Sequence, residues 1–206
     1  MAKKDLSKEL QELYFPSAKE PMLVKVPKMN FIMVDGQGDP NTSKDYMSAI
    51  GALYSVAYTA KFTLKKSAKG KDFIVMPLES LWWTDDPNDF LKGRKEKWHW
   101  TAMIMVPKHV TRKVVDDTIV QLKKKGKDKE LPALPKLRFE EFDEGLSAQI
   151  MHIGPYSEER PNIEKLHKLI QESGHKIVGK HHEIYLGDPR RTKPEKLKTV
   201  IRQPMR

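Results

Sequence analysis

The sequence predicts an α+β fold in which one module of strands and a helix occurs twice. Three observations lead to this prediction. Apolar stripes at helical spacing alternate with short apolar runs, turn residues separate these segments, and each half reads strand, Gly/Pro loop, helix and two more strands. Residue identity between the halves is low, so the repeat depends on element order alone. We therefore expect one joined antiparallel sheet with helices on one face.

The first half opens with a predicted strand over residues 28–36. A turn rich in Gly and Asp follows at residues 36–41, and Thr42 or Ser43 can cap the next helix. The apolar stripe of that helix has helical spacing and consists of Tyr46, Ile50, Leu53, Tyr54, Ala57 and Tyr58. These signals together predict a strand, a tight turn and a long amphipathic helix.

Two further strands are predicted in the first half, over residues 73–78 and 98–106. Thr111 then caps a second helix, whose apolar residues are Val114, Val115, Ile119 and Leu122. A charged linker that contains proline follows at residues 126–135. The first half therefore ends in a helix and a connecting segment.

The second half repeats the pattern. Predicted strands over residues 137–142 and 146–153 flank Asp143-Glu144-Gly145, which is a hairpin signal. After a Gly/Pro loop at residues 154–157, Pro161 opens a helix and Gly174 closes it. The apolar residues of this helix are Ile163, Leu166, Leu169 and Ile170.

A strand from His181 to Leu186 and a return strand over residues 197–205 complete the second half. The whole chain, residues 1–206, is expected to form a single domain. Its first module covers about residues 21–108, a connecting helix and linker cover about 109–136, and the second module covers about 137–206.

Composition excludes several classes of protein. The 206 residues include no cysteine, which excludes disulfides, thiolate metal sites and cysteine nucleophiles. No apolar run is long enough to span a bilayer, and the N-terminus lacks a signal core, so we expect a cytoplasmic protein without a membrane partner. The formal net charge is +10. Because its basic clusters carry no nucleic-acid-binding motif, no specific nucleic acid is expected. Oligomeric state is not readable from the sequence.

Glu183 is the leading candidate for chemistry. On a period of two, His181, Glu183 and Tyr185 share one face of their strand. A glutamate held among aromatic rings is costly as an anion, so its proton affinity should rise or it should gain a cationic partner. Such a residue suits acid–base work or the binding of lipophilic cations. The alternative is a structural ion pair with an arginine of the return strand, such as Arg202.

All four tryptophans lie between Trp82 and Trp100. Trp98 and Trp100 share a strand face, whereas the adjacent Trp82 and Trp83 point to opposite sides, so both cannot face one core. They are either core residues or an apolar wall for a flat, aromatic and possibly cationic ligand. A ligand-lining role for at least two of them is the favoured reading.

No metal or cofactor is expected. Adjacent His181 and His182 diverge on a strand, and His152 is distant in sequence. No metalloprotease or facial-triad spacing is present. The glycine-rich turn at residues 36–41 lacks the ending of a phosphate-binding loop and the spacing of a calcium loop.

The chain resembles the GyrI-like small-molecule-binding family over almost its full length. The pair His-Ile-Gly-Pro-Tyr and Glu-Ile-Tyr-Leu-x-Asp-Pro is specific when it occurs in this order. The segments that carry the resemblance are Phe31 to Asn41, Pro77 to Trp83, Lys97 to Thr101, His152 to Tyr156 and His182 to Arg190. The resemblance implies two strand-helix-strand-strand modules of the SHS2 type, related by a pseudo-two-fold axis, with a ligand cleft between them.

The resemblance also implies roles for individual residues. In members that bind many drugs, an acidic residue in the cleft meets lipophilic cations, and Glu183 occupies the matching position. The tryptophan motifs are similar to a stand-alone subfamily that hydrolyses cyclopropane-bearing, DNA-alkylating natural products. Glu183 is then the expected general base, with Tyr185 or Tyr156 as its hydrogen-bond partner, and Glu79 is a second candidate for the base. The expected ligand-binding residues are Trp82, Trp83, Trp98, Trp100, Glu79, Tyr156, His152 and Tyr54.

Three hypotheses follow from these residues. The first is a detoxifying hydrolase of cyclopropanoid alkylators, and the second is a protein that binds lipophilic cationic drugs without turnover. The third is a protein–protein module that docks through its basic surface, for example on a topoisomerase. Glu183 and the tryptophans serve the first two equally, so the sequence does not separate them.

Overall fold

The structure is a computed structural model that describes residues 4–67, 70–86, 89 and 92–206. The described chain divides into two compact units. The first unit contains Met29–Met76 and Trp82–Phe142 with a short N-terminal segment, and the second contains Ser7–Lys28, Pro77–Leu81 and Asp143–Arg206. The division does not follow the contiguous modules expected from the sequence, because residues 7–28 and 77–81 belong to the second unit.

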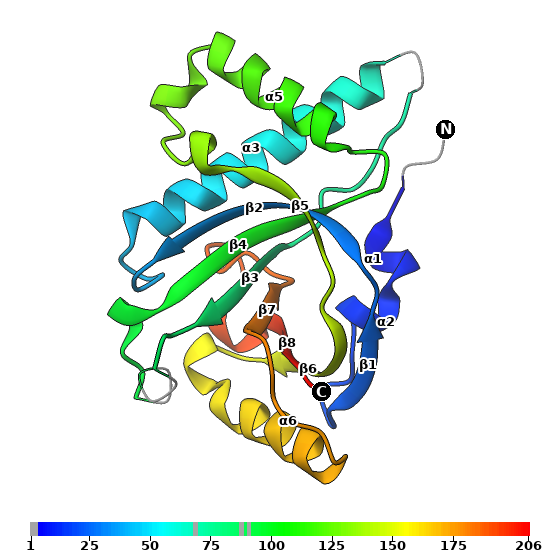
Figure 1. Ribbon diagram of the computed structural model, residues 1–206, viewed down its shortest axis with the longest axis vertical. Helices are drawn as coiled ribbons and strands as arrows, with labels where there is room; N and C mark the ends of the chain where they lie inside the picture. Colours follow the sequence, from blue (N-terminus) through cyan, green and yellow to red (C-terminus); the bar gives the residue numbers. More distant parts are fainter. Residues whose placement is uncertain (1–3, 68–69, 87–88, 90–91) are drawn as a thin grey trace. The chain divides into compact units, whose positions relative to one another are not determined.

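In the first unit, strand β2 (Met29–Gln37) pairs antiparallel with β4 (His99–Val106) and with β5 (Arg138–Phe142). The end of β3 (Leu78–Trp83) lies beside β4. Helix α3 (Lys44–Lys66) packs on β2 and β4, and α5 (Arg112–Lys124) lies beside α3 (Figure 1). Short 3-10 turns connect these elements at Lys95–Lys97 (η1), Lys127–Lys129 (η2) and Leu134–Lys136 (η3).

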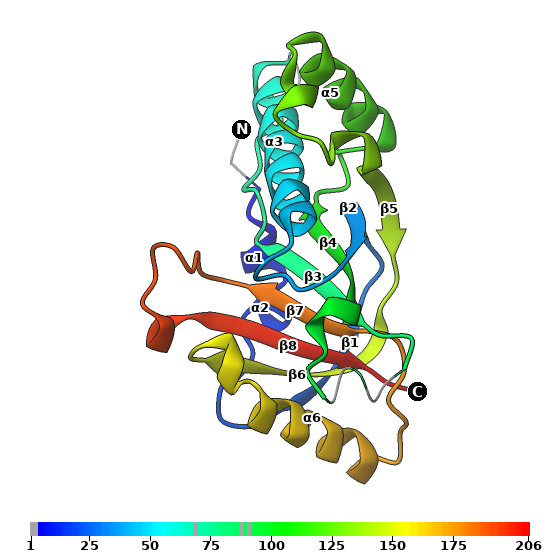
Figure 2. The same ribbon diagram turned by 90° about the vertical axis from the view of Figure 1, so that its left-hand side faces the viewer.

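The second unit begins with two short helices, α1 (Leu6–Glu9, whose first residue belongs to the first unit) and α2 (Gln11–Tyr14). Its strands run in the order β1-β6-β8-β7, and the start of β3 lies next to β7. Helix α6 packs along β6 and β8 (Figure 2). The bounds are β1 (Met22–Val26), β6 (Gly145–Ile153), η4 (Tyr156–Glu158), α6 (Arg160–Glu172), β7 (His181–Tyr185), η5 (Pro194–Lys196) and β8 (Lys198–Pro204).

The predicted duplication is confirmed by the order of the elements. One module consists of β2, α3, β3 and β4 in chain order, and the other consists of β6, α6, β7 and β8. The strands also lie in matching spatial orders, β2-β4-β3 and β6-β8-β7. All pairings recorded between the named strands are antiparallel. The fold is therefore α+β, built from two strand-helix-strand-strand modules.

The predicted helix starts are also correct. The Ser43 hydroxyl accepts a hydrogen bond from the backbone N–H of Tyr46, and the Thr111 hydroxyl accepts one from that of Val114. Pro161 lies in the first turn of α6, where its missing N–H costs nothing. The basic run that begins at Lys123 starts in the last turn of α5, continues beyond its end and is exposed, as expected for cations at a helix C-terminus.

Two predicted elements are wrong. Residues 73–78 do not form a strand, since Phe73 makes only an isolated bridge and β3 starts at Leu78. Pro77 has no N–H to donate to a ladder, which explains the late start. The predicted hairpin at Asp143-Glu144-Gly145 also does not form. β6 already has β1 and β8 on its two edges, so β5 pairs with β2 instead.

The two faces of the second unit have different coverings. α6 covers an apolar core whose buried residues are Ala148, Ile150, Leu166, Ile170, Ile201 and Met205. Gln149 and Arg202 alternate with these positions and point to the other face, where they bond the backbone carbonyls of Glu12 and Leu13 around α2. The sequence did not predict α2. The prediction that the helices cover one face of the sheet is therefore correct for α6 but not for this short helix.

No helix in the described part of the chain combines the length and the apolar character that a membrane span requires.

Candidate functional site

Strand β7 places its residues on two faces, as the sequence predicts. In the antiparallel pairing of β7 with β8, Glu183 lies opposite Ile201 and Tyr185 lies opposite Thr199. Because Ile201 belongs to the core beneath α6, Glu183 points to the α6 side of the sheet. His182 points to the opposite side, toward Glu79 and Glu144. One strand therefore supplies two separate groups of polar residues.

Glu183 is held by its neighbours on the same face. The Tyr185 hydroxyl donates to Oε2 at 2.7 Å, and His181 Nε2 lies 3.1 Å from Oε1. The Glu183 side chain keeps 14% of its surface exposed. His181 is therefore the neighbour of Glu183, whereas Arg202, which the sequence suggested as a structural partner, lies on the other face and pairs with Glu144.

The pKa of Glu183 is lowered, and not raised as one of the two sequence expectations had it. Burial by itself raises this pKa, but hydrogen bonds from His181, Tyr185 and Glu159 outweigh it. Donors to a carboxylate favour its ionised form. Glu183 is therefore an anion at neutral pH.

Two residues of the loop before α6 complete what we call the carboxylate site, made of His181, Glu183, Tyr185, Tyr156 and Glu159. The ring of Tyr156 meets that of Tyr185 edge-on, with centroids 5.7 Å apart. Burial and the nearby charges of Glu159 and Glu183 raise the pKa of Tyr156 to about 12, so its hydroxyl stays protonated. Glu159 is 5% exposed and shares a hydrogen bond with the Glu183 carboxyl.

His152 positions this loop. Its Nε2 lies 3.1 Å from the Pro155 carbonyl and therefore donates, and its Nδ1 accepts from the Asn162 amide at 3.1 Å. Both ring nitrogens are thus used inside the protein, and the side chain is buried. His152 was expected to bind ligand, but its contacts fix the path of Gly154-Pro155-Tyr156 and with it the place of Tyr156.

The other face of the second unit holds the closed cluster, defined as Tyr14, Glu79, Glu144, His182 and Arg202. Both oxygens of Glu79 are occupied, one by the Tyr14 hydroxyl at 2.7 Å and one by His182 Nε2 at 3.0 Å. Glu144 bonds His182 Nδ1 at 2.8 Å and Arg202 at 2.9 Å. All of these side chains are buried, so Glu79, expected as a ligand residue, is enclosed by internal partners.

The charges of the closed cluster balance one another. Burial lowers the pKa of His182, but the charge and hydrogen bonds of Glu144 and Glu79 raise it to about 9. Burial raises the pKa of Glu144, and His182 with Arg202 lowers it to about 2. At neutral pH the imidazolium and the guanidinium therefore lie among two glutamates. Such a fully paired cluster fixes the N-terminal segment to the sheet.

In the first unit, Trp82 and Trp100 are core residues. Their exposed fractions are 3% and 1%, and Tyr46 of α3 packs against both rings, with centroids 5.4 and 5.0 Å away. Trp100 lies flat on Gly36, where a Cβ would come within 2.2 Å of the indole. Gly36 is therefore required for packing, and the structural reading of these two tryptophans is favoured.

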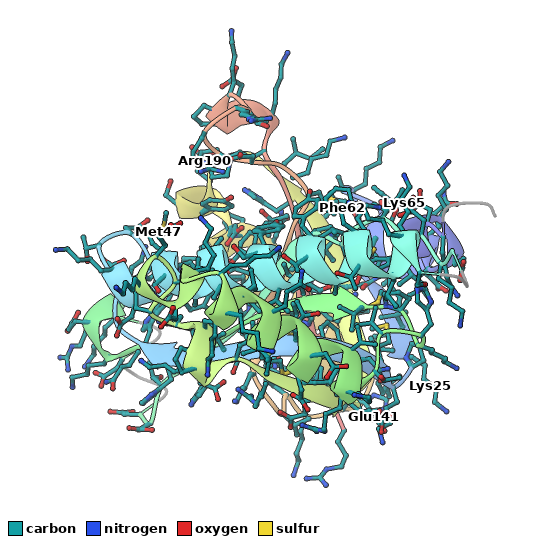
Figure 3. The ribbon with its side chains drawn as sticks, turned by 90° about the horizontal axis from the view of Figure 1, so that it is seen from above. Lys25, Met47, Phe62, Lys65, Glu141 and Arg190 are labelled. Carbon is teal, nitrogen blue, oxygen red and sulfur yellow. The ribbon has the colours of Figure 1, made fainter. Side chains whose placement is uncertain are left out.

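The other predicted aromatic residues of the first unit are half-buried. Trp98 lies against Trp82 and under the Lys95 ammonium, while Trp83 stacks on His99 with the rings 19° apart. Tyr54 begins a ladder of stacked rings along α3 with Tyr58 and Phe62, at centroid separations of 6.2 and 6.3 Å. Met47 and Phe62 lie on the same side of α3 (Figure 3).

A small cavity lies in the first unit. It has a volume of about 80 Å³ and is lined by Val34, Asp35, Asp45, Ser48, Trp100, Pro132, Ala133 and Lys136. Pockets for drug-sized ligands measure roughly 300 to 1,000 Å³. This cavity is too small for a flat natural product. Within the described residues, no group of three or more histidine, aspartate or glutamate side chains is placed to hold a metal ion.

Glu159 and Thr199 are polar residues of the α6 side that sequence reasoning missed. Glu159 lies in a loop with no periodicity, and Thr199 looks like an ordinary strand residue. Thr199 is fully buried, and its hydroxyl has no hydrogen-bond partner within the described residues. Acidic residues directly before the first turn of a helix were the one available signal for Glu159.

The chain belongs to the GyrI-like family, since the model of the GyrI-like small molecule binding domain matches residues 19–206. It is similar to a hydrolase from Listeria innocua, with 35% identity, a TM-score of 0.86, and 99% of this chain and 100% of that one covered. An uncharacterized conserved protein from Listeria innocua is 36% identical, with a TM-score of 0.85 and the same coverage. A search of curated proteins gives no match.

The C-terminal domain of EcmrR is 10% identical, with a TM-score of 0.54 and coverage of 91% of this chain and 97% of that one. At this identity the likeness concerns the fold alone. The α+β fold and the family match together define a small-molecule-binding domain.

Proposed function

We propose that this protein is a hydrolase that adds water to the cyclopropane ring of flat, DNA-alkylating cyclopropanoid natural products and so detoxifies them. The observation that carries the proposal is Glu183, an ionised carboxylate with 14% of its side chain exposed and with donors on both oxygens. The similarity to a Listeria hydrolase at 35% identity supports hydrolysis as the reaction class. The substrate class follows from the resemblance in the tryptophan motifs.

Ring opening by water requires few catalytic groups because the cyclopropane of the substrate is strained. Its cyclopropane is conjugated to a dienone, and polarising the carbonyl makes a ring carbon electrophilic. Water then forms a bond to that carbon, the strained C–C bond breaks, and a phenol that no longer alkylates DNA results. A general base that removes the proton of water contributes roughly 10² to 10⁴ in rate.

Glu183 is the proposed base, and Tyr185 is its positioning partner. A lowered pKa makes a carboxylate a weaker base, but it also keeps Glu183 ionised in every molecule at neutral pH. The 2.7 Å hydrogen bond from Tyr185 fixes the carboxylate plane. For a strained electrophile, a weak base in a fixed position is sufficient.

The proposed ligand contact beside Glu183 in the second unit is Tyr156, which is 38% exposed. Within the first unit, the half-buried rings of Trp83, Trp98 and Tyr54 keep their predicted ligand-binding role as a separate proposal. Wide rings with an exposed face bind flat ligands. For Trp82, Trp100, Glu79 and His152 the internal contacts described above favour structural roles. Among these four side chains, the Trp100 indole N–H is the one buried group without a hydrogen-bond partner in the described part of the chain.

A second candidate function is binding of lipophilic cations without turnover. It is favoured by the lowered pKa of Glu183, since a permanent anion in an aromatic setting is a counter-charge for a cation. Glu183 would then contribute affinity for cations and nothing to the fate of a neutral drug.

Incubation with a cyclopropanoid alkylator, followed by mass spectrometry, tests both functions. Hydrolysis yields product heavier by one water over many turnovers, whereas binding alone leaves intact drug at stoichiometric amounts. Glu183→Gln keeps the shape and removes the charge, so turnover should drop by about 100-fold or more. Glu164→Gln, at an exposed position of α6, is the matched control and should keep full activity.

The result on a neutral alkylator decides the role of Glu183. Full turnover by Glu183→Gln would refute the general-base assignment. A loss of affinity for tetraphenylphosphonium with unchanged hydrolysis of the neutral drug would instead support the counter-charge.

A further inference from the structure

The small cavity of the first unit is lined by residues that take no part in the proposed function. Its walls come from β2, from the start of β4, from the first turns of α3 and from the segment around η3. Val34, Ala133 and Trp100 are buried residues of the lining, whereas Asp45 and Lys136 are exposed. The cavity therefore has an apolar inner end and a charged opening.

The inner end of the cavity carries a hydrogen-bond donor without an acceptor. The indole Nε1 of Trp100 is buried and has no hydrogen-bond partner within the described residues. The ring atom Cε2, which is bonded to Nε1, lies over Gly36, where a Cβ would come within 2.8 Å of it. Gly36 follows Val34 and Asp35 of the cavity wall, so this edge of the indole lies at the cavity. Because a buried donor is costly to leave unpaired, a molecule with an acceptor atom gains by binding here.

Two charges of opposite sign at the opening are available to a ligand. Asp45 and Lys136 both line the cavity, and neither forms an ion pair in the part of the chain that the structure describes. The third charged residue of the lining, Asp35, is already used. It accepts from the Thr101 hydroxyl at 2.7 Å and pairs with Arg138 at 2.7 Å. The cavity therefore offers one anion, one cation and one buried donor.

We propose that this cavity binds a small zwitterionic α-amino acid such as glycine. The ligand carboxylate accepts from the Trp100 indole N–H and pairs with Lys136, and the ligand ammonium pairs with Asp45. A simple anion is repelled by Asp45. A simple cation is repelled by Lys136 and leaves the indole donor without an acceptor. A zwitterion satisfies all three groups, and this match of charges selects the ligand class.

The volume of the cavity sets the size of the ligand. It measures about 80 Å³. One water molecule needs roughly 10 to 15 Å³ of such space, so the ligand has about five to eight non-hydrogen atoms. Glycine and alanine fall in this range, and a flat natural product does not. The Ser48 hydroxyl accepts from the Ala133 N–H at 3.1 Å and still has its own hydrogen to donate to the ligand carboxylate.

Titration of the full chain with glycine, followed by NMR of the tryptophan indole N–H signals, tests the site. Triple-resonance spectra assign the Trp100 signal. We expect glycine to move it saturably, with a Kd on the order of 1 mM, which is within the reach of so small a ligand. Asp45→Asn and Lys136→Gln should each weaken binding by about tenfold, the worth of one hydrogen bond to a charged group. Lys113→Gln, at an 81% exposed position of α5, is the matched control and should bind normally.

Acetate and methylammonium each carry one half of the zwitterion, and both should bind at least about tenfold more weakly than glycine. Acetate that binds as tightly as glycine would mean a simple anion site and would overturn the proposal. So would a Trp100 signal that none of the three probes moves, because the cavity then holds only water. An equal loss of binding in Lys113→Gln would assign the effect to net charge and would also refute the site. The experiment uses no drug and no turnover, so its outcome is independent of the proposed function.

Discussion

Two neighbouring residues of strand β7 belong to different groups of polar residues, which differ in burial and in hydrogen-bond partners. His182 lies in the closed cluster, where it is 1% exposed and bonded on both ring nitrogens. Glu183, the next residue, lies in the carboxylate site, where its side chain is 14% exposed and its pKa depends on donors from two different elements. The alternation of a strand is enough to separate them.

The difference lies in how completely each group is satisfied. In the closed cluster two carboxylates meet an imidazolium and a guanidinium, and the Arg202 guanidinium also bonds Gln149 and the Leu13 carbonyl. On the α6 side of the sheet, two carboxyls lie together and the buried hydroxyl of Thr199 has no partner within the described residues. The balanced cluster stabilises the fold, and the proposed chemistry is assigned to the site whose carboxylate stays partly exposed.

The largest expected effect comes from breaking the closed cluster with Arg202→Met. This change leaves the buried Glu144 carboxylate without its guanidinium and should lower the free energy of unfolding by about 3 to 5 kcal/mol. Urea unfolding monitored by tryptophan fluorescence measures it. Arg190→Met is the control, because Arg190 is 82% exposed and its pair with Asp188 is worth at most about 1 kcal/mol. Equal losses in the two variants would remove the distinction drawn here.

The closed cluster should also make stability fall at alkaline pH. The pKa of His182 is about 9 in the folded chain, against about 6.5 for an unfolded histidine. A raised folded pKa stabilises in full below about pH 6.5, and the contribution is lost as pH rises through about 9, on the order of 3 kcal/mol in total. Urea titrations across this range should show the decline. A His182→Gln chain should lack it, and an identical slope in that variant would assign the pH dependence to other groups.

The smallest effect is expected at Thr199 on the α6 side of the sheet. Thr199→Val keeps the shape and removes a hydroxyl that has no hydrogen-bond partner in the described structure, so stability should change by less than about 1 kcal/mol or increase. Thermal unfolding and turnover are the measurements. A loss of more than about 2 kcal/mol would mean that a bound water satisfies this hydroxyl and belongs to the site.

Local signals in the sequence were sufficient for most elements of the fold. Caps at Ser43 and Thr111, Pro161 in the first turn of α6 and apolar spacing predicted helices within a few residues of their observed bounds. These local signals did not predict which strands pair, because strand pairing depends on residues that are far apart in the sequence. The turn at residues 143–145 has hairpin chemistry, yet β5 and β6 pair with other strands. Turn residues specify a change of direction and do not specify which strands pair.

By itself, the sequence determined that Glu183 and His182 lie on opposite faces of one strand, because alternation is a property of the extended backbone. Only the tertiary structure decided what each of them meets. Glu144 reaches His182 across 38 positions of the chain, and the Leu13 carbonyl reaches Arg202 across 189. Glu159 reaches Glu183 from the loop before α6, and this contact helps to lower a pKa that burial alone would raise. Hydrogen bonds and charges act over a few ångströms, so their partners are set by packing and not by sequence separation.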